Sequence, residues 1–263
     1  MDNLGSIALA HQKSLKKRVT VALLSVIGIY SFVYLQVDPI TPLLTLPNVF
    51  LFFGENFFPP NFNGFSSYIT LIVQTLLFAV VGTYISAVLS FVFGLLMAES
   101  INPIAPLRIA VRFIVSFIRN IPILVWASLL VYIFGIGNMV GLIALILATF
   151  GFLTRSYAEE MNNIADSKLE ALKATGATPA QLLVHGIIPA FFPAWINWTF
   201  FSFEINIRAS SILGMVGAGG IGIMIQTNIR LFKYQEAMAL IIILVILVLL
   251  TEFCVNKLRK WIL

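Results

Sequence analysis

Long apolar stretches separated by short polar segments dominate the pattern of this chain. Several approach or exceed about 20 residues, the length a helix needs to cross the hydrocarbon core of a bilayer. The expected fold class is therefore all-α, a polytopic membrane protein. After an N-terminal segment at 1–18, one transmembrane domain at 19–263 is expected to contain about six transmembrane helices, at 19–37, 68–97, 121–136, 139–157, 190–213 and 237–255.

The composition agrees with lipid as the solvent. The chain is 60% hydrophobic and 10% charged, with a mean hydropathy of +1.00, whereas soluble domains carry about 25% charged residues. Its net charge of +5 comes from basic residues between the apolar stretches, which favours membrane orientation over nucleic-acid binding. The single cysteine, Cys254, excludes an internal disulfide, and no metal or cofactor motif is present.

The segments between the spans carry further expectations. The first apolar stretch follows a basic segment, as in a signal peptide, but no small-residue cleavage site follows, so a retained span is favoured. Residues 38–67 are rich in Pro, Asn and Phe and are predicted to form an interfacial loop. Residues 107–119 are predicted to form an interfacial helix, and residues 214–236 a Gly-rich turn and a polar loop.

The distribution of Lys and Arg predicts the orientation. With the N-terminus inside, 13 of these residues fall on cytoplasmic segments and two, Arg230 and Lys233, on external ones. Cytoplasmic segments carry the excess of positive charge in membrane proteins, so both termini are expected in the cytoplasm.

A polar segment at 158–186 has a helix-turn-helix pattern. Ala, Leu, Glu and Lys dominate 166–174, which favours a helix. Gly176 can adopt a positive φ and end that helix, while Thr178 suits the N-cap and Pro179 the first position of a second helix. The two helices would form a compact knob for docking on a partner protein. The residues alone leave an amphipathic surface loop as the alternative.

Charged and polar residues also occur inside the fifth span, at Glu204, Asn206 and Arg208. Such residues are costly in a bilayer and usually face protein or water. Glu204 and Arg208 lie four residues apart, so they could neutralise each other on one helix face. They could equally form an anion site on a translocation path, and the two roles can coexist.

The glycine run at 217–222 satisfies the pattern G-x-G-x-x-G, with Gly217, Gly219, Gly220 and Gly222. That pattern indicates dinucleotide binding only after a strand and with an acidic residue about 20 positions further on. Here a span precedes it and no acidic residue lies at that distance. The run instead favours a backbone that bends or packs closely, either as a gate or as a packing contact.

The spacing within 170–189 resembles the EAA motif of ATP-binding-cassette (ABC) importer permeases, which is Glu-Ala-Ala, three residues, Gly, nine residues, Ile-x-Leu-Pro. Glu170, Ala171, Gly176 and Pro189 match that motif. The resemblance implies a type I importer permease fold, with these four residues coupling the chain to an ATPase.

Further runs resemble the permeases of phosphonate importers over roughly residues 50–263. They read FFPP at 57–60, FGLLMAE at 93–99, RNIP at 119–122, FEINIRAS at 203–210, VGAGGIG at 216–222 and LRK at 258–260. The resemblance implies import of phosphonates or related oxyanions such as phosphite. It also implies two cytoplasmic ATP-binding subunits, an external substrate-binding protein, and a second permease copy or paralogue.

Other functions receive less support from the residues. Methionine importer permeases share the glycine-rich turn but not the charged run, and a secondary transporter would not need the knob. No catalytic set and no Walker A motif are present, so the chain is not expected to be an enzyme and ATP hydrolysis would belong to another chain.

The orientation can be tested by cysteine labelling of intact cells. Cysteines placed in 38–67 or 214–236 should react with a membrane-impermeant reagent, because these segments are expected outside. Cysteines in 158–186 should react only after the membrane is opened. External labelling of 158–186 would contradict the predicted topology.

Overall fold

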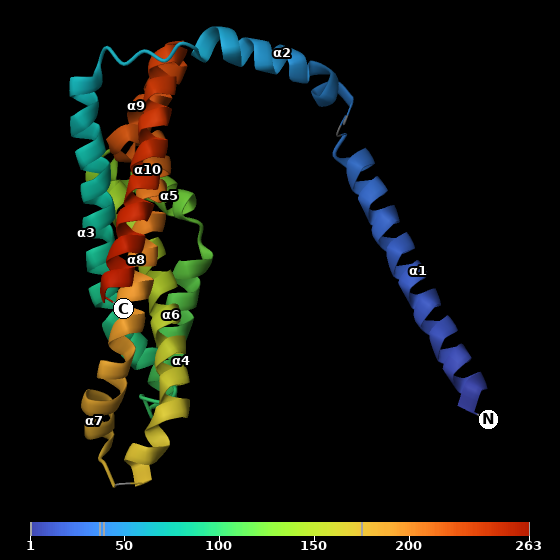
Figure 1. Ribbon diagram of the computed structural model, residues 1–263, viewed down its shortest axis with the longest axis vertical. Helices are drawn as coiled ribbons and strands as arrows, with labels where there is room; N and C mark the ends of the chain where they lie inside the picture. Colours follow the sequence, from blue (N-terminus) through green and yellow to red (C-terminus); the bar gives the residue numbers. More distant parts are fainter. Residues whose placement is uncertain (1, 37, 39, 175, 263) are drawn as a thin grey trace. The chain divides into compact units, whose positions relative to one another are not determined.

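A computed structural model describes residues 2–36, 38, 40–174 and 176–262, although not the side chains of 2–12, 14, 166–174 and 218. All regular structure in the described residues is helical, which confirms the all-α class (Figure 1). The chain divides into two units, Met1–Asn56 and Phe57–Leu263, and each is treated by itself.

The first unit consists of α1 (Asp2–Tyr34) and most of α2 (Ile40–Phe57). The prediction of a loop over 38–67 is wrong for α2. Asp38 caps this helix, because its Oδ1 accepts hydrogen bonds from the amides of Ile40 at 2.9 Å and Thr41 at 3.3 Å. The Thr41 hydroxyl also donates to the Asp38 carboxylate, and together these bonds hold the pKa of Asp38 below its usual value.

The second unit is a bundle in which α3, α6, α8 and α10 run along one another (Figure 1). Its elements in chain order are α3 (Phe65–Met97), α4 (Ala105–Asn120), α5 (Ile123–Phe134), α6 (Asn138–Ala174), α7 (Pro179–Gln181), a π-helical segment (Leu182–Ile187), α8 (Ile188–Leu213), a second π-helical segment (Gly214–Ala218), α9 (Gly220–Arg230) and α10 (Tyr234–Ile262).

Five helical stretches among the described residues are long and apolar enough to cross a membrane, and a bent pair can supply a sixth. The five are Leu15–Tyr34, Phe65–Met97, Asn138–Ala165, Pro179–Gly217 and Tyr234–Ile262. The pair consists of α4 and α5, which meet at 87°. The third span, expected at 121–136, is therefore not one straight crossing. Its 12-residue helix α5 measures about 18 Å, short of a hydrocarbon core of about 30 Å.

Small residues along one face of α3 allow α6 to approach closely. The buried face includes Ala79, Gly82, Ser86, Ser90 and Gly94. A Cβ atom on Gly82 would lie 2.7 Å from Cδ2 of Leu145 on α6, and one on Gly94 would lie 3.2 Å from Cβ of Tyr157. Membrane helices associate through such contacts, because lipid offers no hydrophobic force between them.

Hydrogen bonds between side chains connect the same helices. The Asn206 amide on α8 donates to Oγ1 of Thr83 on α3 at 2.8 Å and accepts from Oγ1 of Thr149 on α6 at 2.9 Å. Ser86 and Ser90 on α3 donate to the carbonyls of Ile146 and Phe150 at 3.1 and 3.2 Å. Three helices thus share buried polar contacts that no lipid could replace.

Helix α9 corrects the prediction of a polar loop over 214–236. Its first amides, of Gly220 and Ile221, donate to the side chains of Gln74 at 3.2 Å and Thr75 at 3.0 Å on α3. The helix therefore begins on acceptors that lie 146 residues away in the chain. Local composition contains no signal for such a start.

Close packing at Gly222 generates a stability prediction. A Cβ atom there would overlap the Ser211 carbonyl oxygen of α8, so Gly222→Ala should lower the free energy of unfolding by about 1–3 kcal/mol. Gly137→Ala is the control, since a Cβ atom at Gly137 meets nothing within 4 Å. Thermal unfolding in detergent measures both variants, and equal midpoints would contradict the packing argument.

Candidate functional site

The turn after α6 has the local geometry that the sequence predicts. Helix α6 continues past Arg155 to Ala174, and Gly176 follows with a φ of +79°. Thr178 then caps α7 through a capping box with Gln181, and Pro179 occupies the first turn. The predictions for Gly176, Thr178 and Pro179 are therefore confirmed as local structure. The side chains of Glu170 and Ala171 lie outside the described residues.

A π-helical segment connects α7 to α8 just before Pro189. The amide of Ile188 donates to the carbonyl of Leu183, five residues back, which is π-helical spacing. Proline lacks an amide N–H, and its ring crowds the carbonyl four residues earlier. The wider π-helical turn thus lies at the position where, in a regular α-helix, the ring of Pro189 would clash with a backbone carbonyl. The helical run starts at Pro179, ahead of the expected start at 190.

Glu204 and Arg208 form the expected pair on α8. Arg208 Nη2 lies 3.5 Å from Glu204 Oε1, one helical turn away. The Glu204 side chain is 16% exposed and the Arg208 side chain 54% exposed. The guanidinium is therefore held at one end by a sheltered carboxylate and keeps free donor positions at the other.

Arg208 also lines a cavity of about 410 Å³ between α8, α9 and α10. The rest of the lining is almost entirely apolar, and it includes Ile212, Met215, Ile225 and Leu249. A cation beside an apolar wall interacts with an anion more strongly than it would in bulk water.

Asn206 occupies a different place from its charged neighbours. Its side chain is buried, and its amide is bonded to Thr83 and Thr149. The structure therefore brings Glu204 and Arg208 together and places Asn206 in the contact between helices. A contact of Asn206 with substrate stays a prediction.

The glycine run combines unusual backbone conformations with close packing. Gly217, Gly219 and Gly220 have φ values of +100°, +89° and +72°, a region that residues with a Cβ atom rarely adopt. A Cβ atom on Gly219 would overlap Oδ1 of Asn138, and Gly222 lies against α8. The run is thus a close-packed turn between α8 and α9. A role as a gate stays a prediction.

Sequence reasoning missed two groups of residues. Gln74 and Thr75 hold the start of α9, and their only signal was two polar residues inside an apolar span. Arg112 and Arg119 line a pocket with Arg155, whereas the sequence pattern uses them only as part of the positive charge that predicts orientation. Their spacing of seven residues, about two helical turns, places them on one helix face and could have indicated the pocket.

Known proteins show the same fold and sequence pattern. Residues 90–262 match the family model for binding-protein-dependent transport system inner membrane components. A phosphite transport system permease of Stutzerimonas stutzeri is 34% identical over 85% of this chain and 81% of that protein. A phosphate-import permease of Mycolicibacterium smegmatis is 31% identical over 88% of this chain, which spans 43% of that protein.

A solved structure supports the fold independently. An inward-facing methionine ABC transporter aligns with a TM-score of 0.66 at 22% identity, over 74% of this chain and 96% of that one. The bundle and its site thus define a polytopic helical permease with the ABC importer permease fold. The chain belongs to the family of binding-protein-dependent transport system inner membrane components, which confirms the family expected from the EAA-like spacing.

Proposed function

We propose that this chain is the permease subunit of an ATP-driven importer for phosphonates or related phosphorus oxyanions such as phosphite. The observation that carries the proposal is the half-exposed Arg208 guanidinium, paired with Glu204 in an apolar span. The relatives from S. stutzeri and M. smegmatis, a phosphite transport permease and a phosphate-import permease, support the same substrate class.

The proposed assembly contains two permease chains, either two copies of this one or this chain and a paralogue. Two separate ATP-binding subunits hydrolyse ATP in the cytoplasm, and an external substrate-binding protein delivers the anion. Both termini of this chain lie in the cytoplasm. The positive-inside distribution of Lys and Arg supports that orientation.

Coupling to the ATPase is assigned to residues 166–185. Helix α6 is one continuous element from the transmembrane core to Ala174, so a displacement at its end can reach the core without a hinge. The Gly176 turn fixes the angle between α6 and α7, and α7 continues helically toward Pro189 and α8. A displacement of residues 166–185 by the ATPase would therefore move α6 and α8 together.

Anion passage is assigned to Arg208. A planar guanidinium can donate two parallel hydrogen bonds to a phosphonate or phosphite, which suits this substrate class better than an ammonium would. Glu204 keeps the guanidinium oriented and competes with the anion for it. That competition keeps binding weak, and a transport site must release its substrate as well as bind it.

Two alternatives have less support. A permease for methionine would share the fold, but a probable D-methionine permease of Vibrio cholerae is only 24% identical, over 54% of this chain. A secondary transporter with Glu204 and Arg208 as an ion relay would need neither the knob nor an ATPase. Uptake by proteoliposomes that depends on ATP and on the ATPase subunits separates the importer from that second alternative.

Gly176→Val tests the coupling assignment. Valine at a φ of +79° is strained by roughly 1–3 kcal/mol, so the knob should lose its shape and both ATPase co-purification and uptake should fall. Gly176→Asn is the matched control, because asparagine tolerates positive φ and should retain coupling. Glu170→Ala is expected to weaken uptake too. Full uptake by both Gly176→Val and Glu170→Ala would show that coupling lies elsewhere.

Arg208→Gln tests the anion assignment in proteoliposomes that contain the ATPase subunits. The variant should assemble normally yet take up phosphite or a phosphonate at least about tenfold more slowly, since a charge-assisted hydrogen bond is lost. Arg230→Gln, an exposed arginine at the end of α9, is the matched control.

The double variant distinguishes the anion role from a purely structural pair. If the pair only neutralises itself, Glu204→Gln with Arg208→Gln should transport better than either single variant, because no unpaired charge remains. If Arg208 contacts the anion, the added Glu204→Gln should not restore uptake. Restored uptake in the double variant would contradict the assignment of Arg208 as an anion contact.

A further inference from the structure

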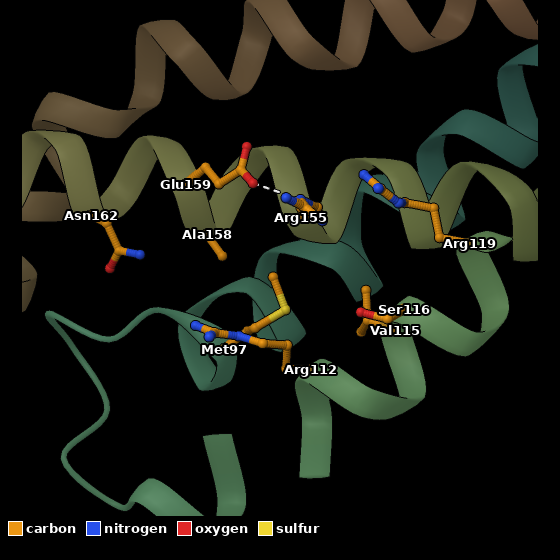
Figure 2. Close-up of a pocket in the computed structure, with 9 residues that line it drawn as sticks. All are labelled: Met97, Arg112, Val115, Ser116, Arg119, Arg155, Ala158, Glu159 and Asn162. Atoms are coloured by element: carbon orange, nitrogen blue, oxygen red, sulfur yellow. Dashed lines mark hydrogen bonds and ion pairs between the residues drawn. The ribbon is translucent and has the colours of Figure 1, made fainter. Parts of the chain in front are cut away.

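A pocket of about 270 Å³ lies where the end of α3 meets α4 and α6 (Figure 2). Its floor is apolar and buried, formed by Met97, Val115 and Ala158. Its walls carry the polar side chains, which are Arg112, Ser116, Arg119, Arg155, Glu159 and Asn162. Figure 2 shows Arg119 extending toward Arg155, with Arg112 on the opposite side of the space.

The charges of this pocket are not balanced. Arg155 Nε lies 2.6 Å from Glu159 Oε1, so the one carboxylate in the lining is already paired with an arginine of its own helix. Within the part of the chain whose side chains are described, the guanidinium groups of Arg112 and Arg119 form no hydrogen bond and no ion pair. The lining therefore carries three guanidinium groups against one carboxylate, and two of the three have no carboxylate partner.

The neutral side chains of the walls can add further donors. Asn162 uses its Oδ1 to accept hydrogen bonds from the Ser100 amide at 3.1 Å and hydroxyl at 2.8 Å. That bonding fixes the amide orientation and leaves the Nδ2 group, which Figure 2 shows on the pocket side, as a donor. Apart from Glu159, the polar lining thus offers donors to a ligand.

Packing between α4 and α6 positions the backbone of Arg119. Helix α4 ends directly on α6, because a Cβ atom at Gly151 of α6 would lie 3.0 Å from both Cα and Cβ of Arg119. Arg108 on the same helix behaves differently, since it donates to the Asn102 carbonyl at 2.9 Å and lies 3.5 Å from Glu99. One arginine of α4 is thus bonded inside the protein, while the exposed guanidinium groups of Arg112 and Arg119 have no partner among the described side chains.

We propose that this pocket is a binding site for a phosphate group. Guanidinium groups recognise phosphate oxygens through paired hydrogen bonds, and here they approach from two helices above an apolar floor. The phosphate could belong to a soluble anion or to the headgroup of an anionic phospholipid, because basic pockets between transmembrane helices bind such headgroups. Bound there, it would bridge α4 to α6, the helix that leads to the Gly176 turn.

The experiment compares two probes on the purified full chain. Inorganic phosphate is tested on lipid-stripped protein by equilibrium dialysis with radiolabelled phosphate at constant ionic strength. Phosphatidylglycerol is tested in nanodiscs diluted with phosphatidylcholine, with the retained lipid counted by native mass spectrometry. The variant is Arg112→Gln with Arg119→Gln, and the control is Lys257→Gln, which removes an exposed charge from α10.

The expected result is that the wild type and Lys257→Gln bind at least one probe, and that the double arginine variant binds it at least about tenfold more weakly. Binding of phosphate alone identifies a soluble anion, and binding of phosphatidylglycerol alone identifies a lipid. If neither probe binds, or if the double variant binds as tightly as the wild type, the proposal is overturned.

A gain of affinity provides a second test that misfolding cannot imitate. Glu159→Gln removes the one carboxylate of the lining and releases Arg155, so the bound probe should be held several-fold more tightly. Unchanged or weaker binding in Glu159→Gln would contradict the assigned charge balance and overturn the site.

Discussion

The hydrogen bonds of Asn206 are the constraint on which the arrangement of this bundle depends. In lipid no water can satisfy a buried amide, so Asn206 on α8 must meet Thr83 and Thr149 together. That requirement fixes the rotation of α8 against α3 and α6. Residues two positions apart on a helix point about 200° away from each other. Glu204 and Arg208 therefore face away from the contact of Asn206 with Thr83 and Thr149. The exposure of Arg208 follows from the burial of Asn206.

Features determined by neighbouring residues could be predicted from the sequence. The Gly176 turn, the Thr178 cap and the Glu204–Arg208 pair each depend on residues within a few positions of one another. The long apolar spans could be predicted for a similar reason, because each reflects its own composition. Local composition still misled in two places. The Pro- and Asn-containing segment 38–67 is predicted to be a loop although it contains α2, and a run of apolar residues does not indicate whether it forms one straight crossing or bends, as α4 and α5 do.

Features created by distant contacts could not be predicted. The first amides of helix α9 donate hydrogen bonds to Gln74 and Thr75 of α3. The sequence of α9 itself does not indicate these acceptors. The position of Arg119 depends on Gly151 of α6. In the glycine run, by contrast, the local pattern suggests a role that the structure does not show. Its pattern imitates a nucleotide-binding loop, but its glycines provide positive φ and a close approach to α8, a use that only the packed structure reveals.

The two arginine sites of this chain differ in a way that bears on what each can do. Arg208 has Glu204 one turn away, so an arriving anion must displace or share a carboxylate and is held loosely. Arg112 and Arg119 have no such competitor in the described structure, and the carboxylate of their pocket is already occupied by Arg155. Loose binding suits a site that passes an anion onward. Unopposed donors suit a site that retains its ligand, and this favours a resident phosphate group between α4 and α6 over a second step of transport.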